Sequence, residues 1–228
     1  MSSRRLATVV AGAAALLLCC AVPVQAALLT LSTHASDGIN PPDANQLDAT
    51  FEFSINLSGQ LLLTVHNSTP EDPLNDPALK INEIYFNAKS NIMDLDFVDV
   101  SEGNTGKWVW GFLQGGSDGD GNPHQVDSFG RFDTYVKDKT GSPETYINSG
   151  GSLTFTFNIS WTGTAPLDTD FIELSAQVDD HTISYAAAKF YNGPPEMSAY
   201  GATNIPEPAT IALLGLGALA LLRKRKRA

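Results

Sequence analysis

Cysteine is almost absent from this sequence. The 228 residues include two cysteines, Cys19 and Cys20, and both lie in an apolar stretch near the N-terminus. The rest of the chain therefore cannot form a disulfide. Stability has to come from a hydrophobic core, which a composition of 43% apolar residues can supply at this length.

Positive charge is scarce outside the two ends. Seven of the fourteen basic residues are Arg4, Arg5 and the five residues 223–227. Residues 27–204 contain 24 acidic and 7 basic side chains, a net charge of −17. Because nucleic-acid binding needs Lys and Arg to neutralise phosphates, we expect no nucleic-acid partner. The charge suits an extracellular protein and leaves room for cations such as calcium.

A helical stripe is also missing between the two ends. Apolar and polar residues alternate there with period two, which is typical of strands with one buried face. The alternation is clearest in residues 51–58, 153–162 and 172–178. Further strands are predicted over residues 28–33, 60–66, 81–87, 94–100, 107–113, 129–136 and 182–190. Between Leu95 and Val100 the apolar phase slips by one residue, which predicts a β-bulge.

Clusters of Gly, Pro, Asn and Asp separate these segments and predict turns. Nine or ten short strands joined by turns predict an all-β chain, an antiparallel β-sandwich of jelly-roll type, because such chains must close or double their sheets to protect strand edges. We expect this domain over residues 27–191. Residues 192–204, which include Gly193-Pro194-Pro195-Glu196, are expected to form a linker.

The first 26 residues have the three parts of a signal peptide. Arg4 and Arg5 give a positive start, an apolar run follows over residues 6–21, and Val24-Gln25-Ala26 supplies small residues at the spacing that signal peptidase needs. We therefore predict that residues 1–26 are removed by cleavage after Ala26. The alternative is a retained N-terminal anchor, for which the apolar run is short.

The last 24 residues, 205–228, predict a transmembrane tail. Pro206-Glu207-Pro208 precedes an uncharged run over residues 211–222, and five cations follow at 223–227. As a helix, residues 205–222 would reach roughly 27 Å, which barely spans a bilayer. The cations would stay in the cytoplasm, so the body of the chain would lie on the outer side, with both prolines at the outer membrane face.

This order of parts resembles the PEP-CTERM sorting signal. The resemblance implies that the membrane enzyme exosortase recognises and cuts the tail near Pro206, Glu207 and Pro208, in the inner membrane of a Gram-negative-type bacterium that makes extracellular polysaccharide. The three residues would be a recognition site without a catalytic role. Residues 128–133 and 187–190 also resemble other exported PEP-CTERM proteins of this sandwich kind. The alternative is an ordinary tail anchor.

One loop offers oxygen ligands for calcium. Asp118, Asp120 and Asn122 stand at every second position between glycines, as at the start of calcium loops. The continuation differs from a calcium-binding helix-loop-helix, because position 129 is Phe where the last ligand would be Glu. A non-helical calcium loop and a solvated turn both remain open. No other cofactor is expected.

Trp108 and Trp110 fall on one face of a predicted strand. Paired aromatic rings can stack on sugars, which makes them candidate glycan-binding residues, while core packing is the more usual fate. Residues 115–119 match the serine nucleophile-elbow pattern, but the glycines and Pro123 that follow cannot open the required helix. We therefore expect no enzyme and no catalytic residues.

Two functions remain open at this stage. The first is a structural or interaction protein of the cell surface or the extracellular polysaccharide matrix, membrane-held for a time and then processed at its tail. The second is a carbohydrate-binding module, assisted by calcium at the Asp118 loop. The two differ in whether the tryptophans are exposed.

Overall fold

The computed structural model describes residues 26–31, 33–37, 47–70, 79–103, 105–112, 124–126, 129–139, 146–177, 183–191 and 198–203. These residues form strands and short 3-10 helices, and no α-helix occurs among them. The strands are β1 (Ala27–Thr30), β2 (Thr33–Asp37), β3 (Ala49–Ile55), β4 (Gln60–Asn67), β5 (Lys80–Phe86), β6 (Ile92–Val100), β7 (Trp108–Phe112), β8 (His124–Val126), β9 (Gly130–Phe132), β10 (Thr134–Asp138), β11 (Ser152–Trp161), β12 (Ala186–Tyr191) and β13 (Ser198–Ala202). The 3-10 helices are η2 (Ser101–Gly103), η3 (Thr105–Lys107) and η4 (Asp168–Phe171).

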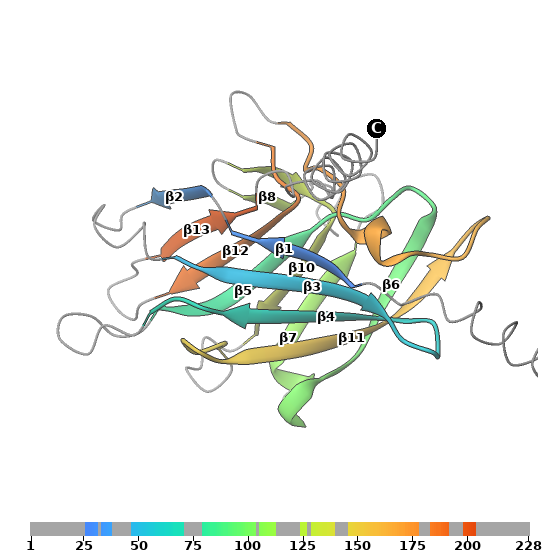
Figure 1. Ribbon diagram of the computed structural model, residues 1–228, viewed down its shortest axis with the longest axis horizontal. Helices are drawn as coiled ribbons and strands as arrows, with labels where there is room; N and C mark the ends of the chain where they lie inside the picture. Colours follow the sequence, from blue (N-terminus) through green and yellow to red (C-terminus); the bar gives the residue numbers. More distant parts are fainter. Residues whose placement is uncertain are drawn as a thin grey trace, which may run out of the picture.

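The strands form two large antiparallel sheets and one small one. The first large sheet has the order β1-β3-β4-β11-β6, and the second has the order β2-β13-β12-β5-β10-β7. Strands β8 and β9 make a separate pair. In Figure 1 the first sheet lies in front, with β5, β10 and β12 behind it. The all-β prediction with antiparallel sheets is confirmed, and the arrangement is compatible with a jelly-roll sandwich.

One hydrophobic core lies between the two large sheets. Aromatic rings cross it: Phe53 of the first sheet meets Phe86 of the second with ring centroids 5.4 Å apart, and Trp108 meets Phe155 at 5.0 Å. Phe51, Phe53, Phe86, Phe155 and Phe157 are all fully buried. Burying one such side chain stabilises the fold by about 1.5–3 kcal/mol, so this core can stabilise the chain without a disulfide.

The period-two pattern explains which side chains enter this core. In β4 half-buried and buried residues alternate strictly, and along β11 every second residue is buried until its last residues. The predicted bulge is also present. Thr156 of β11 faces Asp99 and the next residue, Phe157, faces Phe97, so Val98 is the extra residue of β6. The slip in apolar phase thus marks a real insertion into the ladder.

Two predicted strands are each split. Residues 28–33 contribute to β1 in the first sheet and to β2 in the second, with buried Leu31 between them. Residues 129–136 are divided into β9 and β10 at Asp133. In both cases one continuous run of apolar residues is divided between two sheets. The period of the apolar residues does not show where the chain passes from one sheet to the other.

The predicted strand over residues 172–178 is wrong. Its described part, residues 172–177, leaves η4 as an irregular segment, and only Ala176 makes an isolated bridge, to Arg131. Leu174 is exposed where a strand would bury it. The alternation is present, but between the described residues 172–177 and the strands, the backbone bonds are those of this one bridge to β9, too few for a ladder.

A second, smaller core lies on the outer face of the six-stranded sheet. Val126, Phe129 and Phe132 of the β8–β9 pair are buried there against Tyr85 and Ala187. Beside it Lys189 of β12 bonds Glu83 of β5 at 2.9 Å and lies 5.6 Å from the centroid of the Tyr200 ring.

The end of the predicted linker belongs to the domain. Residues 198–202 form β13, which pairs with β12 on one side and with β2 on the other. The expected linker over 192–204 therefore includes an interior strand. Its Ser, Ala and Gly residues lack the apolar alternation that marks strands elsewhere.

Candidate functional site

The last described residue, Thr203, fixes the point where the chain leaves the sandwich. Its side chain is fully buried. Its backbone N–H donates to the Ala186 carbonyl at 2.9 Å, and its Oγ1 accepts from the Ala186 N–H at 3.0 Å. The Thr203 carbonyl accepts from the Tyr185 N–H at 3.3 Å. Only Asn204 and Ile205 separate this anchored residue from Pro206.

Strand registers define which end of the sandwich this is. Pairing places Ala27 opposite Phe53 and Ile92 opposite Trp161 in the first sheet, and Ala186 opposite Phe86 in the second. Thr203 lies beside Ala186 in the second sheet, but it is also close to the other end of the first sheet, because Leu31, which is bonded to Ala49, packs against Gly201. We call the end that carries the β3–β4 turn (56–59), the β5–β6 loop (87–91) and the β11–β12 connection (162–185) the exit end.

The β11–β12 connection runs from the first sheet to the second across the exit end. The Ile55 N–H donates to Asp168 Oδ1 at 2.9 Å, which ties η4 to the end of β3. Further along, Ser175 Oγ donates to the Phe129 carbonyl at 2.7 Å and accepts from the Ser184 N–H at 3.0 Å. These bonds hold a segment that has no place in either large sheet.

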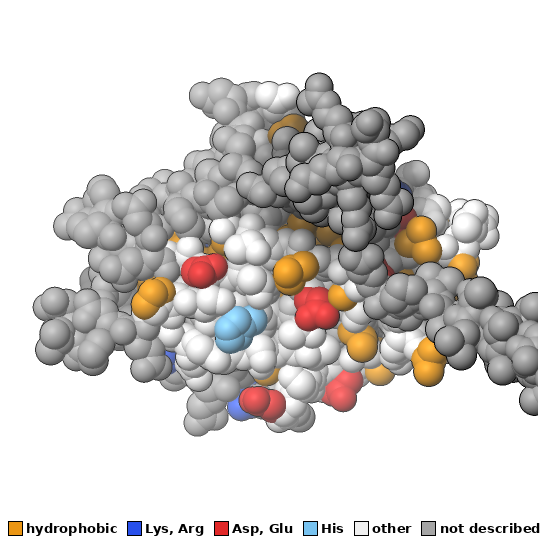
Figure 2. All heavy atoms as spheres, in the orientation of Figure 1, with side chains coloured by type: hydrophobic (Ala, Val, Ile, Leu, Met, Phe, Trp, Pro, Cys, Tyr) orange, Lys and Arg blue, Asp and Glu red, His pale blue; other side chains and the backbone are white. Residues whose placement is uncertain are grey.

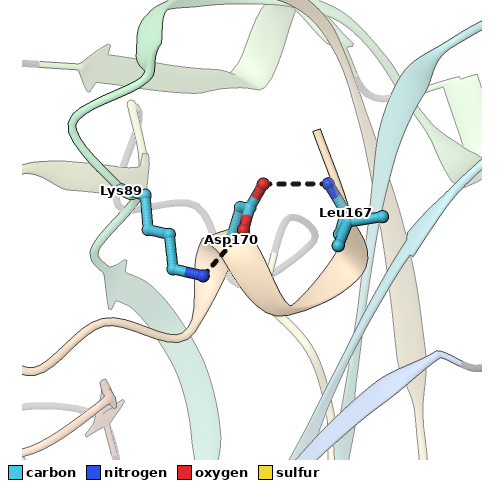
Figure 3. A network of polar contacts seen from close by, with 3 residues as sticks. All are labelled: Lys89, Leu167 and Asp170. Atoms are coloured by element: carbon cyan, nitrogen blue, oxygen red, sulfur yellow. Dashed lines mark hydrogen bonds and ion pairs between the residues drawn. The ribbon is translucent and has the colours of Figure 1, made fainter. Parts of the chain in front are cut away.

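An ion pair anchors η4 to the β5–β6 loop (Figure 3). Lys89 Nζ lies 2.8 Å from Asp170 Oδ1, and the Leu167 N–H donates to Asp170 Oδ2 at 2.9 Å. Burial alone would raise the pKa of the Asp170 carboxyl, but the hydrogen bonds from Lys89 and Leu167 and the charge of Lys89 hold this pKa below its ordinary value. Asp170 is therefore a carboxylate with defined donors.

Asp133 is a second carboxyl at the exit end, at the break between β9 and β10. The Ala88 N–H lies 3.3 Å from both carboxyl oxygens, and Thr134 Oγ1 donates to Oδ1 at 3.0 Å. Burial raises the pKa of Asp133 to about 7, with a smaller contribution from the negative charge of Glu173, and these hydrogen bonds oppose the rise. Asp133 can therefore exchange a proton near neutral pH while it ties β10 to the end of β5.

The exit end also exposes large apolar side chains. They lie in the β3–β4 turn, at the start of β6, at the end of β11 and in the β11–β12 connection: Leu57, Met93, Trp161, Leu167, Leu174 and Ile183. In the space-filling view hydrophobic side chains gather on the right, where β3 and β11 end in Figure 1 (Figure 2).

The structure separates the two candidate glycan-binding tryptophans. Both point toward the first sheet, but Trp108 is 3% exposed and packs edge-on against Phe155, whereas Trp110 is 38% exposed and lies 5.2 Å from Phe97 between ring centroids. Of these two rings, only that of Trp110 is exposed enough for a sugar to stack on it. Trp108 is a core residue, so the prediction that it binds glycan beside Trp110 is wrong for Trp108.

The other candidate site residues have different outcomes. Ala26 stands directly before β1, so cleavage after it would leave Ala27, the first residue of that strand, at the new N-terminus. Asp118, Asp120 and Asn122 lie outside the described residues, as do Pro206, Glu207 and Pro208. Within the described part of the chain, no three His, Cys, Asp or Glu side chains are grouped as metal ligands. A search of that same part finds no helix with the length and apolar character of a membrane span.

Comparison with known proteins identifies the C-terminal segment. The family model of the PEP-CTERM protein-sorting motif matches residues 204–227. The match contains Pro206, Glu207 and Pro208 and begins at the residue after Thr203. The chain thus carries this motif, which indicates an exported protein that exosortase sorts. No curated protein and no solved structure matches the chain.

Sequence reasoning missed the polar groups of the exit end. Asp133 lies inside a predicted strand, between buried Phe132 and buried Thr134, and an acid at such a position is a signal for a break in the strand. The Lys89–Asp170 pair joins residues that are 81 positions apart, and no local pattern links them. The role of Thr203 depends on β13, which the sequence did not predict.

Proposed function

We propose that this chain is a structural or interaction protein of the cell envelope or the extracellular polysaccharide matrix, without catalytic activity. The signal peptide sends it across the inner membrane, the tail holds it there for a time, and exosortase cuts near Pro206-Glu207-Pro208. Signal peptidase and exosortase are its processing enzymes, and extracellular polysaccharide is its proposed surrounding partner. The sandwich then remains on the cell surface or in the matrix.

The observation that carries this proposal is the position of the sorting motif relative to the domain. The motif match begins at residue 204, and the residue before it is buried and hydrogen-bonded to β12. The sandwich and the sorting signal are thus joined without a spacer of their own. The net charge of −17 over residues 27–204 supports a location outside the cytoplasm.

Substitution of the motif tests the sorting step. In the native host, replacing Pro206, Glu207 and Pro208 together by Ala should leave an uncut form in the inner-membrane fraction, while the unchanged protein is processed. The chain offers a matched control, because Pro194, Pro195 and Glu196 have the same composition twelve residues upstream. Their replacement by Ala should leave processing intact. Equal processing of both variants would contradict the proposed role of the motif.

A carbohydrate-binding function is the second candidate, and Trp110 is the observation that favours it. Its ring is 38% exposed beside Phe97, on edge strand β7. If the host polysaccharide binds there, titration should change the Trp fluorescence, and Trp110→Ala should remove the change. Trp161→Ala, which removes an indole of similar exposure, is the control. A response that Trp110→Ala leaves intact would count against this site.

A further inference from the structure

We propose that removal of the signal peptide creates an ion pair at the start of the domain, between the new α-ammonium of Ala27 and the side-chain carboxylate of Asp168 in η4. Hydrolysis of the Ala26–Ala27 bond consumes one water and leaves a carboxylate on Ala26 and an amine on Ala27, which is protonated at neutral pH. The inference rests on the proposed function, because it requires signal peptidase to cut after Ala26. It assigns Asp168 a role that neither the core nor the sorting motif explains.

The first argument is the direction of the backbone groups of β3. The Leu31 N–H donates to the Ala49 carbonyl at 3.0 Å, so the backbone groups of Ala49 point to the side of β3 on which β1 lies. In an antiparallel ladder every second residue repeats this direction. The backbone groups of Phe53, which is opposite Ala27, therefore point toward β1. Those of Ile55 point to the same side.

Asp168 lies just beyond the first residue of β1. The Ile55 N–H donates to Asp168 Oδ1 at 2.9 Å, so the carboxylate lies on the β1 side of β3, two residues past the pair of Ala27 with Phe53. Two residues of an antiparallel strand rise about 6.8 Å. Because the Ala27 nitrogen faces Phe53, it lies within roughly 7 Å of Asp168 Oδ1.

The second argument is that Asp168 has no cation as its partner in the described part of the chain. All seven Lys and Arg residues of the segment 27–204 are described, and their ion pairs with described acids join Lys89 to Asp170 and Lys189 to Glu83. Asp168 is half-buried and belongs to neither pair. A positive charge that forms within about 7 Å of this carboxylate is therefore attracted to it.

Other acids near the start of β1 are weaker partners. Asp170 is already paired with Lys89. Glu52 is opposite Leu28 in the ladder, but its side chain is exposed, and solvent weakens the attraction between exposed charges. Asp179 and Asp180 lie outside the described residues. Their contribution is measured by a separate variant.

The ion pair can exist only in the processed chain. In the precursor the Ala27 nitrogen is an uncharged peptide amide, whereas after cleavage it is an ammonium at the end of β1, the outermost strand of the first sheet. Chain ends fray unless they are tied down. Attraction to Asp168 ties the new N-terminus to η4, which Lys89 in turn joins to the β5–β6 loop through Asp170. Cleavage thus stabilises the strand whose end it exposes.

The reactivity of the α-amine tests this pair. The full chain is expressed with its own signal peptide, and the exported protein is treated with a trace of acetic anhydride at pH 7 and at pH 10.5. Proteolysis before Asp37 releases residues 27–36, which contain no lysine, so an acetyl group on this peptide reports on the α-amine. An ammonium does not react until it loses its proton. We expect acetylation at pH 7 to be at least threefold faster in Asp168→Asn than in the unchanged protein. At pH 10.5 both amines are deprotonated, so the two rates should be equal.

Two control variants accompany this measurement. Asp94→Asn makes the same change in net charge on β6, four strands from β1 in the first sheet and therefore roughly 19 Å away. It should change the rate at pH 7 by less than about 1.5-fold. Asp179→Asn combined with Asp180→Asn should also change it by less than about 1.5-fold. Asp168→Asn keeps a side-chain oxygen that can accept the Ile55 N–H, so this variant should retain the fold.

Several outcomes would overturn the ion pair. Equal rates for Asp168→Asn and the unchanged protein at pH 7 would mean that Asp168 does not hold the ammonium. A difference that persists at pH 10.5 would mean that Asp168 only shields the amine from the reagent. An effect of equal size in either control variant would show that the overall negative charge, and no specific partner, retains the proton.

The mass of the released peptide separates this inference from the proposed function. If the peptide begins at Ala27 and Asp168→Asn has no effect, the ion pair is wrong and the predicted processing stands. If the peptide does not begin at Ala27, both the ion pair and the predicted signal-peptidase cleavage fail.

Discussion

At the residue scale, Gly130 shows how one position constrains the fold. Its φ angle is +84°, in the left-handed region that favours glycine, and a Cβ there would lie 2.6 Å from the Ala176 carbonyl oxygen. Its neighbour Arg131 exchanges two backbone hydrogen bonds with Ala176. Gly130 therefore lets β9 approach the β11–β12 connection closely enough to bond it.

Replacement of Gly130 by Ala should destabilise the protein by about 2–5 kcal/mol, from backbone strain and the clash with Ala176 together. Gly59→Ala is the matched control, because Gly59 has a φ of +75° and a Cβ added there would have no atom within 4 Å. Strain alone should cost about 1–2 kcal/mol at that position. Urea unfolding monitored by circular dichroism measures both. Equal losses would show that the close approach to Ala176 contributes nothing.

Asp133 gives a prediction for pH dependence. Its folded pKa of about 7 lies above the ordinary value of 3.8, so between these values the folded state holds a proton that the unfolded state has released. Stability should therefore fall as pH rises from about 4 to 7 and change little above that. At roughly 1.4 kcal/mol per pKa unit, about 4 kcal/mol is the upper limit of the effect.

Asp133→Asn keeps the acceptor oxygen and removes the titration. Thermal melts at pH 5 and pH 8 should show that the unchanged protein loses more stability than the variant between the two conditions. The variant should be the more stable of the two at pH 8, because it buries no charge there. The same difference between the proteins at both pH values would contradict the raised pKa.

At the element scale, the sequence predicted most strands because one face of each is buried. Strand β11 and the bulge at Val98 follow directly from the period of apolar residues. The failures have a common cause. The described residues 172–177 alternate but make only an isolated bridge to β9, and β13 has a partner on each side but little apolar pattern. Strand pairing joins residues that are far apart in the sequence. The local alternation of apolar residues therefore cannot predict it.

The 3-10 helix η4 depends on a pair that sequence could not reveal. Lys89→Met would leave the Asp170 carboxylate, 9% exposed, without its cation, and should destabilise the protein by about 1–3 kcal/mol in urea unfolding. Exposed Lys139→Met is the control and should change stability by less than about 0.5 kcal/mol.

This loss should itself depend on pH. The pKa of Asp170 is lowered in the folded state, so the pair stabilises the protein above the ordinary carboxyl pKa and its contribution disappears as pH falls through the folded value. The difference between the unchanged protein and Lys89→Met should therefore shrink in strongly acidic buffer. A constant difference at all pH values would mean that Lys89 acts by packing of its alkyl chain.

At the scale of the whole molecule, the folded domain begins and ends within a few residues of the two terminal signals. Strand β1 begins at Ala27, directly after the predicted signal-peptidase site, and β13 with Thr203 ends where the sorting motif begins. The motif was predictable because its three parts are contiguous in sequence. The exit end was not, since it joins loops from six strands through registers that only the fold defines.

Mass spectrometry of the protein recovered from its native host tests the central claim most directly, because it locates both ends of the mature chain at once. An exported protein sorted by exosortase should begin at Ala27 and end close to Pro206-Glu207-Pro208. A cytosolic polypeptide that still starts at Met1 and ends at Ala228 would contradict the account.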